Sequence, residues 1–112
     1  MPPAQDGVLE IAMLQLRPGQ VAAFEAAFAQ AQAIIAGMPG YLGHELQRCL
    51  EHDHQYALLV RWRSLQDHTE GFRGSPQYQQ WKALLHHFYD PFPTVLHYHA
   101  VLGSTPSTLA AT

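Results

Sequence analysis

Apolar and polar positions follow one another along the chain in blocks that predict secondary structure. The run from Val8 to Leu16 is apolar and ends at Pro18-Gly19, which is typical of a strand buried on at least one face. After it, apolar positions recur at steps of three and four residues between alanines and glutamines: Val21, Phe24, Phe28, Ala31 and Ile35. This spacing predicts an amphipathic helix, which Gly37 and Pro39-Gly40 end.

A hairpin and a short helix are expected next. Two extended runs, Tyr41 to Leu50 and Gln55 to Trp62, are separated by a short polar loop and should pair antiparallel. Ser64 stands three residues before Asp67, which is the spacing of a capping box. A short helix is therefore predicted from Leu65 to about Arg73.

The last third of the chain predicts one more helix and one more strand. Gly74-Ser75-Pro76 interrupts the helix and restarts it, because serine caps helices well and proline fits the first helical position. The restarted helix has one apolar stripe: Tyr78, Trp81, Leu85 and Phe88. Thr94 to Leu102 is expected to be the last strand, and 103–112 a flexible tail.

The order strand, helix, strand, strand, helix, strand predicts an α+β fold of the ferredoxin-like βαββαβ type. Two helices would cover one face of a four-stranded antiparallel sheet. The strands carry apolar side chains on both faces, so the bare face is expected to pack on a second copy as a homodimer. A chain of 112 residues fits a single domain, 1–112, with its core at about 8–102.

Composition narrows the range of partners. Six Lys and Arg against nine Asp and Glu give a net charge of −3 with no basic cluster, so no nucleic-acid partner is expected. The chain has neither a bilayer-length apolar run nor a leader-like start, which predicts a cytoplasmic protein without a membrane partner. The single cysteine, Cys49, agrees with a reducing compartment. Only 13% of residues are charged, which also favours a surface covered by a second copy.

The segment from Trp62 to Trp81 carries a recognisable pattern of residues: Trp62, Ser64, His68, Phe72, Arg73, Ser75 and Trp81. Together with Gly40-Tyr41-Leu42-Gly43-His44, Pro93 and His97-Tyr98, it resembles the antibiotic-biosynthesis monooxygenase (ABM) family over Val8 to Leu102. The resemblance implies a dimeric α/β barrel with a small-molecule pocket between sheet and helices in each subunit. It also implies a monooxygenase without a cofactor, in which a substrate stabilised as a carbanion or phenolate gives an electron directly to dioxygen.

One departure of the chain from this family pattern is large. Well-studied oxygenases of the family use an asparagine near the substrate, whereas this chain contains none. The positions that match the functional residues of the haem-degrading branch are Ala12, Phe72 and Lys82, and none of them carries the required side chain. The resemblance therefore favours a small aromatic or quinone-like substrate over haem.

Five residues are candidates for the site. An imidazole with an ordinary pKa can accept a phenolic proton near neutral pH, so His68 is the candidate base. Arg73 could hold an anionic substrate oxygen with its fork of donors, or could tie its helix end to Glu70 or Asp67. Flat or polar pocket walls would come from Trp62, Phe72 and His97.

Two alternatives stay open at this level. His97 and His99 share a strand face and could bind a metal ion if His68 or Glu10 supplied a third ligand, although the eight histidines fit no metal-ligand spacing. The protein could also be a non-catalytic ligand-binding or stress-associated dimer with a vestigial pocket. An open cavity reached by His68 and Arg73 would favour catalysis, and a pocket filled by the protein's own aromatic side chains would favour the non-catalytic alternative.

Overall fold

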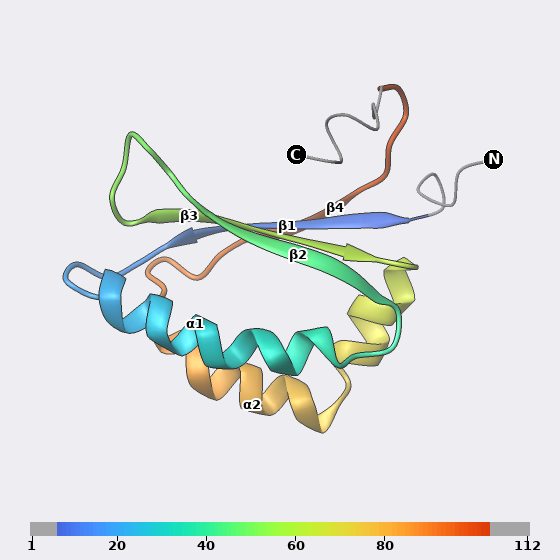
Figure 1. Cartoon of the computed structure of the whole chain (residues 1–112), viewed down its shortest axis with the longest axis horizontal. Coiled ribbons are helices and arrows are strands. Elements are labelled where there is room, and N and C mark those ends of the chain that lie inside the picture. Colours follow the sequence, from blue (N-terminus) through green and yellow to red (C-terminus); the bar gives the residue numbers. More distant parts are fainter. Residues whose placement is uncertain (1–6, 104–112) are drawn as a thin grey trace.

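Four antiparallel strands form one sheet in the order β2-β3-β1-β4 in a computed structural model, which describes residues 7–103 (Figure 1). The elements in chain order are β1 (Val8–Gln15), α1 (Val21–Ala36), β2 (Tyr41–Arg48), β3 (Gln55–Trp62), η2 (Asp67–Phe72), α2 (Pro76–Leu85), η3 (His86–Phe88) and β4 (Val95–Tyr98). This order and topology confirm the predicted α+β, ferredoxin-like βαββαβ fold.

Both long helices lie on the same face of the sheet, as Figure 1 shows. The stripe predicted for the first helix is buried there, since α1 contributes Phe24, Phe28, Ala31 and Ile35 to the core. The ring of Phe24 packs edge-on against Tyr56 of β3 at 5.1 Å between centroids. Burial of each such side chain stabilises the fold by roughly 1.5–3 kcal/mol, so this layer fixes α1 against the sheet.

The two predicted helix starts after the hairpin are present. Ser64 Oγ accepts a hydrogen bond from the Asp67 backbone N–H at 3.1 Å, and the helix begins at Leu65. Ser75 caps α2, and Pro76 occupies its first turn. The capping chemistry read from the sequence therefore sets both boundaries next to the site.

The last strand is shorter than predicted. The expectation of Thr94 to Leu102 is wrong, because β4 spans only Val95–Tyr98 and the four residues that follow are exposed. Tyr98 already pairs with Leu9, and beyond that pair β1 has only Val8 left to offer as a partner. The hairpin strand β2 likewise ends two residues early, at Arg48. From residue 104 on, the predicted tail lies outside the described residues.

The sheet face opposite the helices is largely apolar. Met13, Leu96 and Tyr98 are each about half exposed on this face, at 45%, 52% and 49%. Leu9 and Ile11 of β1 lie beside Tyr98 and Leu96 in the register.

Over residues 7–103, no helix combines the length and the apolar character needed to cross a bilayer.

Candidate functional site

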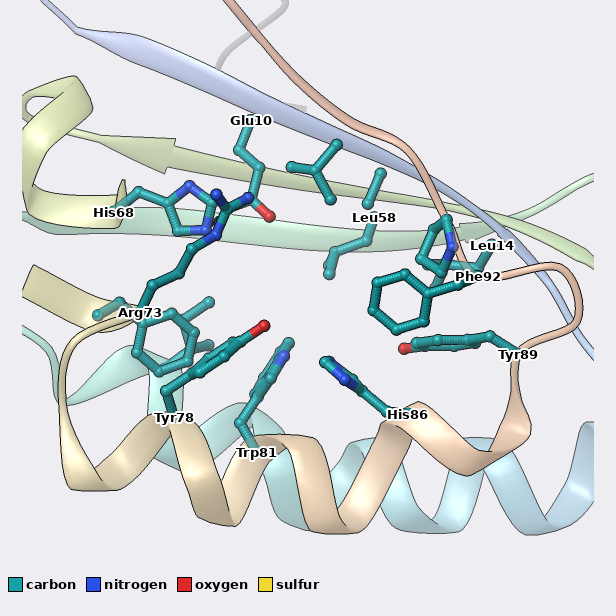
Figure 2. Close-up of a pocket in the computed structure, with 15 residues that line it drawn as sticks. Glu10, Leu14, Leu58, His68, Arg73, Tyr78, Trp81, His86, Tyr89 and Phe92 are labelled. Atoms are coloured by element: carbon teal, nitrogen blue, oxygen red, sulfur yellow. Dashed lines mark ion pairs between the residues drawn. The ribbon is translucent and has the colours of Figure 1, made fainter. Parts of the chain in front are cut away.

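A cavity of about 390 Å³ lies between the inner face of the sheet and α2 (Figure 2). This volume falls in the range of roughly 300–1,000 Å³ that is typical of small-molecule sites. Glu10, His68 and Arg73 lie together at one end of the cavity, and Tyr89 and Phe92 lie at the other. The cavity therefore has a polar end and an aromatic end.

A widened helical turn builds the polar end. η2 is a π-helix, in which the Arg73 N–H donates to the carbonyl of His68, five residues earlier, at 3.1 Å. Single π-turns are uncommon and often occur at functional sites. This turn buries both His68 and Phe72 and brings Arg73 to the cavity rim.

Four side chains from four elements meet at the polar end. Glu10 of β1 accepts a hydrogen bond at Oε1 from Trp62 Nε1–H, at 2.9 Å. His68 Nε2 lies 3.4 Å from the same oxygen, and the ring of His68 stacks on Trp62 at 5.3 Å between centroids with an 18° tilt. His68 Nδ1 and His97 Nε2 of β4 are hydrogen-bonded at 2.8 Å. Within residues 7–103, Glu10 and His68 are the buried polar residues, with exposures of 6% and 3%.

Burial controls the charges of this cluster. It raises the pKa of Glu10, an effect that the Trp62 hydrogen bond and the Arg73 charge partly offset. It lowers the pKa of His68 to about 3, with further contributions from the charge of Arg73 and from His97. Burial, and then Arg73, also lower the pKa of His97. His68 is therefore uncharged at neutral pH, so its contact with Glu10 joins a carboxyl group to a neutral imidazole.

Arg73 points its guanidinium toward the Glu10 and His68 side chains (Figure 2). Within the described range, it forms no ion pair with Asp67 or Glu70, the two partners considered from the sequence. Asp67 instead pairs with Arg63, whose Nε lies 3.4 Å from Asp67 Oδ2. The donors of Arg73 are therefore placed to meet an anion in the cavity.

Aromatic side chains line most of the remaining wall. Tyr78 and Trp81 rise into the cavity from α2, as Figure 2 shows, and Phe72 contacts both rings edge-on at 5.2 Å and 5.6 Å between centroids. Flat apolar walls of this kind favour a planar ligand.

The structure brings the five predicted site residues together in two layers. His68, Arg73 and Phe72 line the cavity, whereas Trp62 and His97 lie behind its wall and contact it through His68. The sequence prediction gave Glu10 no role in this site, except as a conditional metal ligand. The signal for it is the inward alternation of Glu10 with Ala12 and Leu14 on β1, which puts a carboxyl group on the core face.

Two more cavity residues were assigned to the core stripe from the sequence alone. Trp81 is buried as that assignment requires, and Tyr78 is half-buried, yet both also line the cavity. Helical spacing finds the inward face of α2 but does not tell whether that face meets side chains or an open space.

The metal alternative lacks a ligand set in the described part of the chain. No group of three or more His, Cys, Asp or Glu side chains is arranged to hold a metal ion between residues 7 and 103. His99 lies beyond β4 and is exposed. His68 Nδ1 and His97 Nε2, at 2.8 Å, are closer than the separation of about 3.3 Å that two nitrogens have on one tetrahedral zinc, given Zn–N bonds of ~2.0–2.1 Å.

Comparison with known proteins identifies related chains. The family model for antibiotic biosynthesis monooxygenases matches residues 7–84. The uncharacterised protein YczJ of Bacillus subtilis (strain 168) is 58% identical over 94 residues, which cover 84% of this chain and 99% of YczJ.

Solved structures show the same fold. A protein of Bordetella bronchiseptica, described as a candidate antibiotic biosynthesis monooxygenase, superposes with a TM-score of 0.83 at 35% identity and covers 88% of this chain and 100% of its own. SnoaB of Streptomyces nogalater, described as a cofactor-independent oxygenase, has a TM-score of 0.68 at 23% identity over 89% of this chain and 96% of its own. The family model covers well over half of the chain and agrees with the fold and with these relatives, so this protein belongs to the antibiotic biosynthesis monooxygenase family.

Proposed function

We propose that this protein is a monooxygenase that works without a cofactor on a small aromatic or quinone-like compound. The observation that carries the proposal is the two-ended cavity, in which Glu10, His68 and Arg73 face a space walled by aromatic side chains. A planar substrate would bind against the aromatic walls with its acidic group at the polar end.

The chemistry needs proton removal, charge stabilisation and exclusion of water. Loss of a proton from an activated CH₂ group or a phenol leaves an anion whose oxygen Arg73 would hold. The anion gives one electron to dioxygen, and the substrate radical and superoxide combine to form a C–O bond. The resulting peroxide anion takes up a proton, and loss of water then leaves a carbonyl, so that a CH₂ group and O₂ become C=O and H₂O with no external electron donor.

His68 takes part in proton removal in this proposal, together with Glu10. A neutral imidazole whose pKa is about 3 is a weak base when it acts alone. The carboxylate of Glu10 is a stronger base than usual because burial raises its pKa. Since the two groups lie 3.4 Å apart at the polar end, we assign the base function to the pair.

Membership in the family supports the reaction class. SnoaB, a cofactor-independent oxygenase, shares the fold with this chain, which is consistent with chemistry that needs no bound cofactor. The shape and polarity of the cavity support the aromatic or quinone-like substrate class that the family resemblance implies.

Oxygen uptake with anthrone, a planar compound with an acidic CH₂ group, tests the proposal. Purified protein treated with chelator should consume oxygen well above the enzyme-free rate, and His68→Ala should lose most of that activity. Full activity in His68→Ala would show that His68 is not part of the general base. If anthrone binds, as followed by quenching of tryptophan fluorescence, but no oxygen is consumed, the protein is instead a ligand-binding member of the family.

We also propose that two copies pair through the outer sheet face. The exposed apolar side chains of Met13, Leu96 and Tyr98 support this arrangement, because apolar patches of this kind mark interaction sites. Light scattering after size exclusion should give the mass of a dimer, and Met13→Glu should shift it to a monomer. A wild-type monomer at micromolar concentration would contradict the pairing.

We further propose that the protein is cytoplasmic, which cell fractionation would test.

A further inference from the structure

Three titratable side chains form a line from the cavity toward solvent. Glu10 lines the cavity, His68 Nε2 lies 3.4 Å from Glu10 Oε1, and His68 Nδ1 is hydrogen-bonded to His97 Nε2 at 2.8 Å. Exposure increases along the line, because Glu10 and His68 are buried whereas His97 is only half-buried on the edge strand β4. His68 therefore contacts a different neighbour through each of its two ring nitrogens.

The fold holds this line in place from three directions. Glu10 and His97 are direct partners in the register between β1 and β4. His68 reaches them from the π-turn and is held flat by its stacking on Trp62. Trp62 Nε1–H also fixes Glu10 Oε1, so the carboxyl oxygen that faces His68 is positioned.

We propose that Glu10, His68 and His97 form a proton relay that carries the substrate proton from the cavity to solvent. This inference rests on the proposed oxygenase function and adds to it the route by which the proton leaves. Glu10 accepts the proton from the substrate, and the electron pair of the broken bond stays on the substrate. His68 takes that proton on Nε2 as it passes its Nδ1 proton to His97 Nε2, and His97 releases a proton to water. One proton leaves the cavity in this step, and no electron moves along the relay. Because the whole reaction turns CH₂ and O₂ into C=O and H₂O without net release of a proton, one proton returns from solvent to the peroxide anion before water is lost.

The charges around Glu10, His68 and His97 favour passing the proton on over holding it on one of the imidazoles. The charged groups that face His68 are Glu10 and Arg73, and the neighbouring ring is His97. Burial and the Arg73 cation disfavour an imidazolium at His68, so a proton does not rest there. Burial and the same cation also disfavour an imidazolium at His97, which can give the proton up to solvent. Arg73 therefore drives the proton outward while it holds the substrate anion.

The relay predicts a difference between two neighbouring histidines. In His97→Gln, the amide can keep a hydrogen bond to His68, but it cannot accept a proton and pass it on. A purely structural role for His97 would therefore survive this substitution, and a relay would not. His99→Gln is the matched control, because His99 is exposed and lies outside β4.

Exchange of the His68 ring N–H with solvent tests the relay without any substrate. In protein labelled with ¹⁵N-histidine, the exchange rate measured by NMR should fall at least about tenfold in His97→Gln and stay unchanged in His99→Gln. An exchange rate in His97→Gln equal to that of the wild type would overturn the relay. A thermal unfolding midpoint close to that of the wild type shows that each variant keeps the native fold.

Turnover of anthrone provides the second readout. His97→Gln should lower kcat by about tenfold or more with KM unchanged, since general acid–base groups contribute roughly 10²–10⁴-fold. In His97→Ala, added imidazole should restore part of kcat. If the wild type oxidises anthrone and His97→Gln keeps full kcat, the relay fails and the oxygenase proposal stands. If exchange slows as expected but the wild type does not oxidise anthrone, the oxygenase proposal fails and the proton path stands.

Discussion

The substitution His68→Gln should remove a large part of the acid sensitivity of folding. The imidazole binds a proton below about pH 6.5 in the unfolded chain, but only below a pKa of about 3 in the native protein. The unfolded state therefore binds more protons as the pH falls through this window, and the native state loses stability relative to it. Glutamine does not titrate, so the variant lacks this contribution.

The magnitude follows from the two pKa values. Each pKa unit corresponds to about 1.36 kcal/mol, and about pH 5 lies roughly 1.5 units below the unfolded value, so His68 costs about 2 kcal/mol between about pH 7.5 and pH 5. Glu10 has the opposite sign, because its raised pKa stabilises the native state as the pH falls. Burial raises the pKa of Glu10, and Trp62 and Arg73 partly offset that rise; the substitution leaves all three in place, so the contribution of Glu10 cancels in the comparison.

Urea unfolding followed by far-UV circular dichroism, at one fixed protein concentration, measures this difference. Between the two pH values, the wild type should lose about 2 kcal/mol more than His68→Gln, or about 1 M in the urea midpoint at a typical slope of roughly 2 kcal/mol per M. His54→Gln, in the exposed loop between β2 and β3, is the control and should follow the wild type. If the free energy of unfolding changed with pH by the same amount in the wild type and in His68→Gln, the buried, neutral state of His68 would be refuted.

Three other substitutions test the elements around the site. Gly40 has φ +83°, and a Cβ placed there would clash with the Asp67 side chain, so Gly40→Ala should cost about 3 kcal/mol in thermal unfolding. Its control Gly19→Ala, at φ +77° with open space around the Cβ, should cost about 1 kcal/mol. Ser75→Ala removes the cap of α2 and should cost about 1 kcal/mol, measured by urea unfolding; an unchanged midpoint would contradict the capping role. Arg73→Gln should lower kcat/KM for anthrone about tenfold to a hundredfold, the value of a hydrogen bond to a charged group, and an unchanged kcat/KM would remove Arg73 from anion binding.

The fold could be predicted from the spacing of apolar residues and from the helix-capping residues. The three-and-four spacing of Phe24 and Phe28 and the caps at Ser64 and Ser75 are local signals, and the structure uses them as predicted. The end of the last strand was not predictable in this way. It depends on where β1 stops providing a pairing partner for β4, which is a property of the register and not of the residues after Tyr98.

The candidate site was predictable in part of its residues but not in the contacts between them. Residue chemistry pointed to His68 and Arg73, which line the cavity. The sequence did not indicate that burial would make His68 a weak base, because that depends on the π-turn and the stacking on Trp62. The position of Glu10 was visible only as an inward residue of β1, and its contact with His68 joins positions 58 residues apart.

The fate of isotopically labelled dioxygen tests the central claim most directly. Chelator-treated protein and anthrone under ¹⁸O₂ should yield anthraquinone that carries one ¹⁸O atom at the newly formed carbonyl, with the second atom in water. Most of the enzyme-dependent product should be lost in His68→Ala. Product without label, or labelled product formed equally fast without the protein, would contradict the assignment of oxygenation to this cavity.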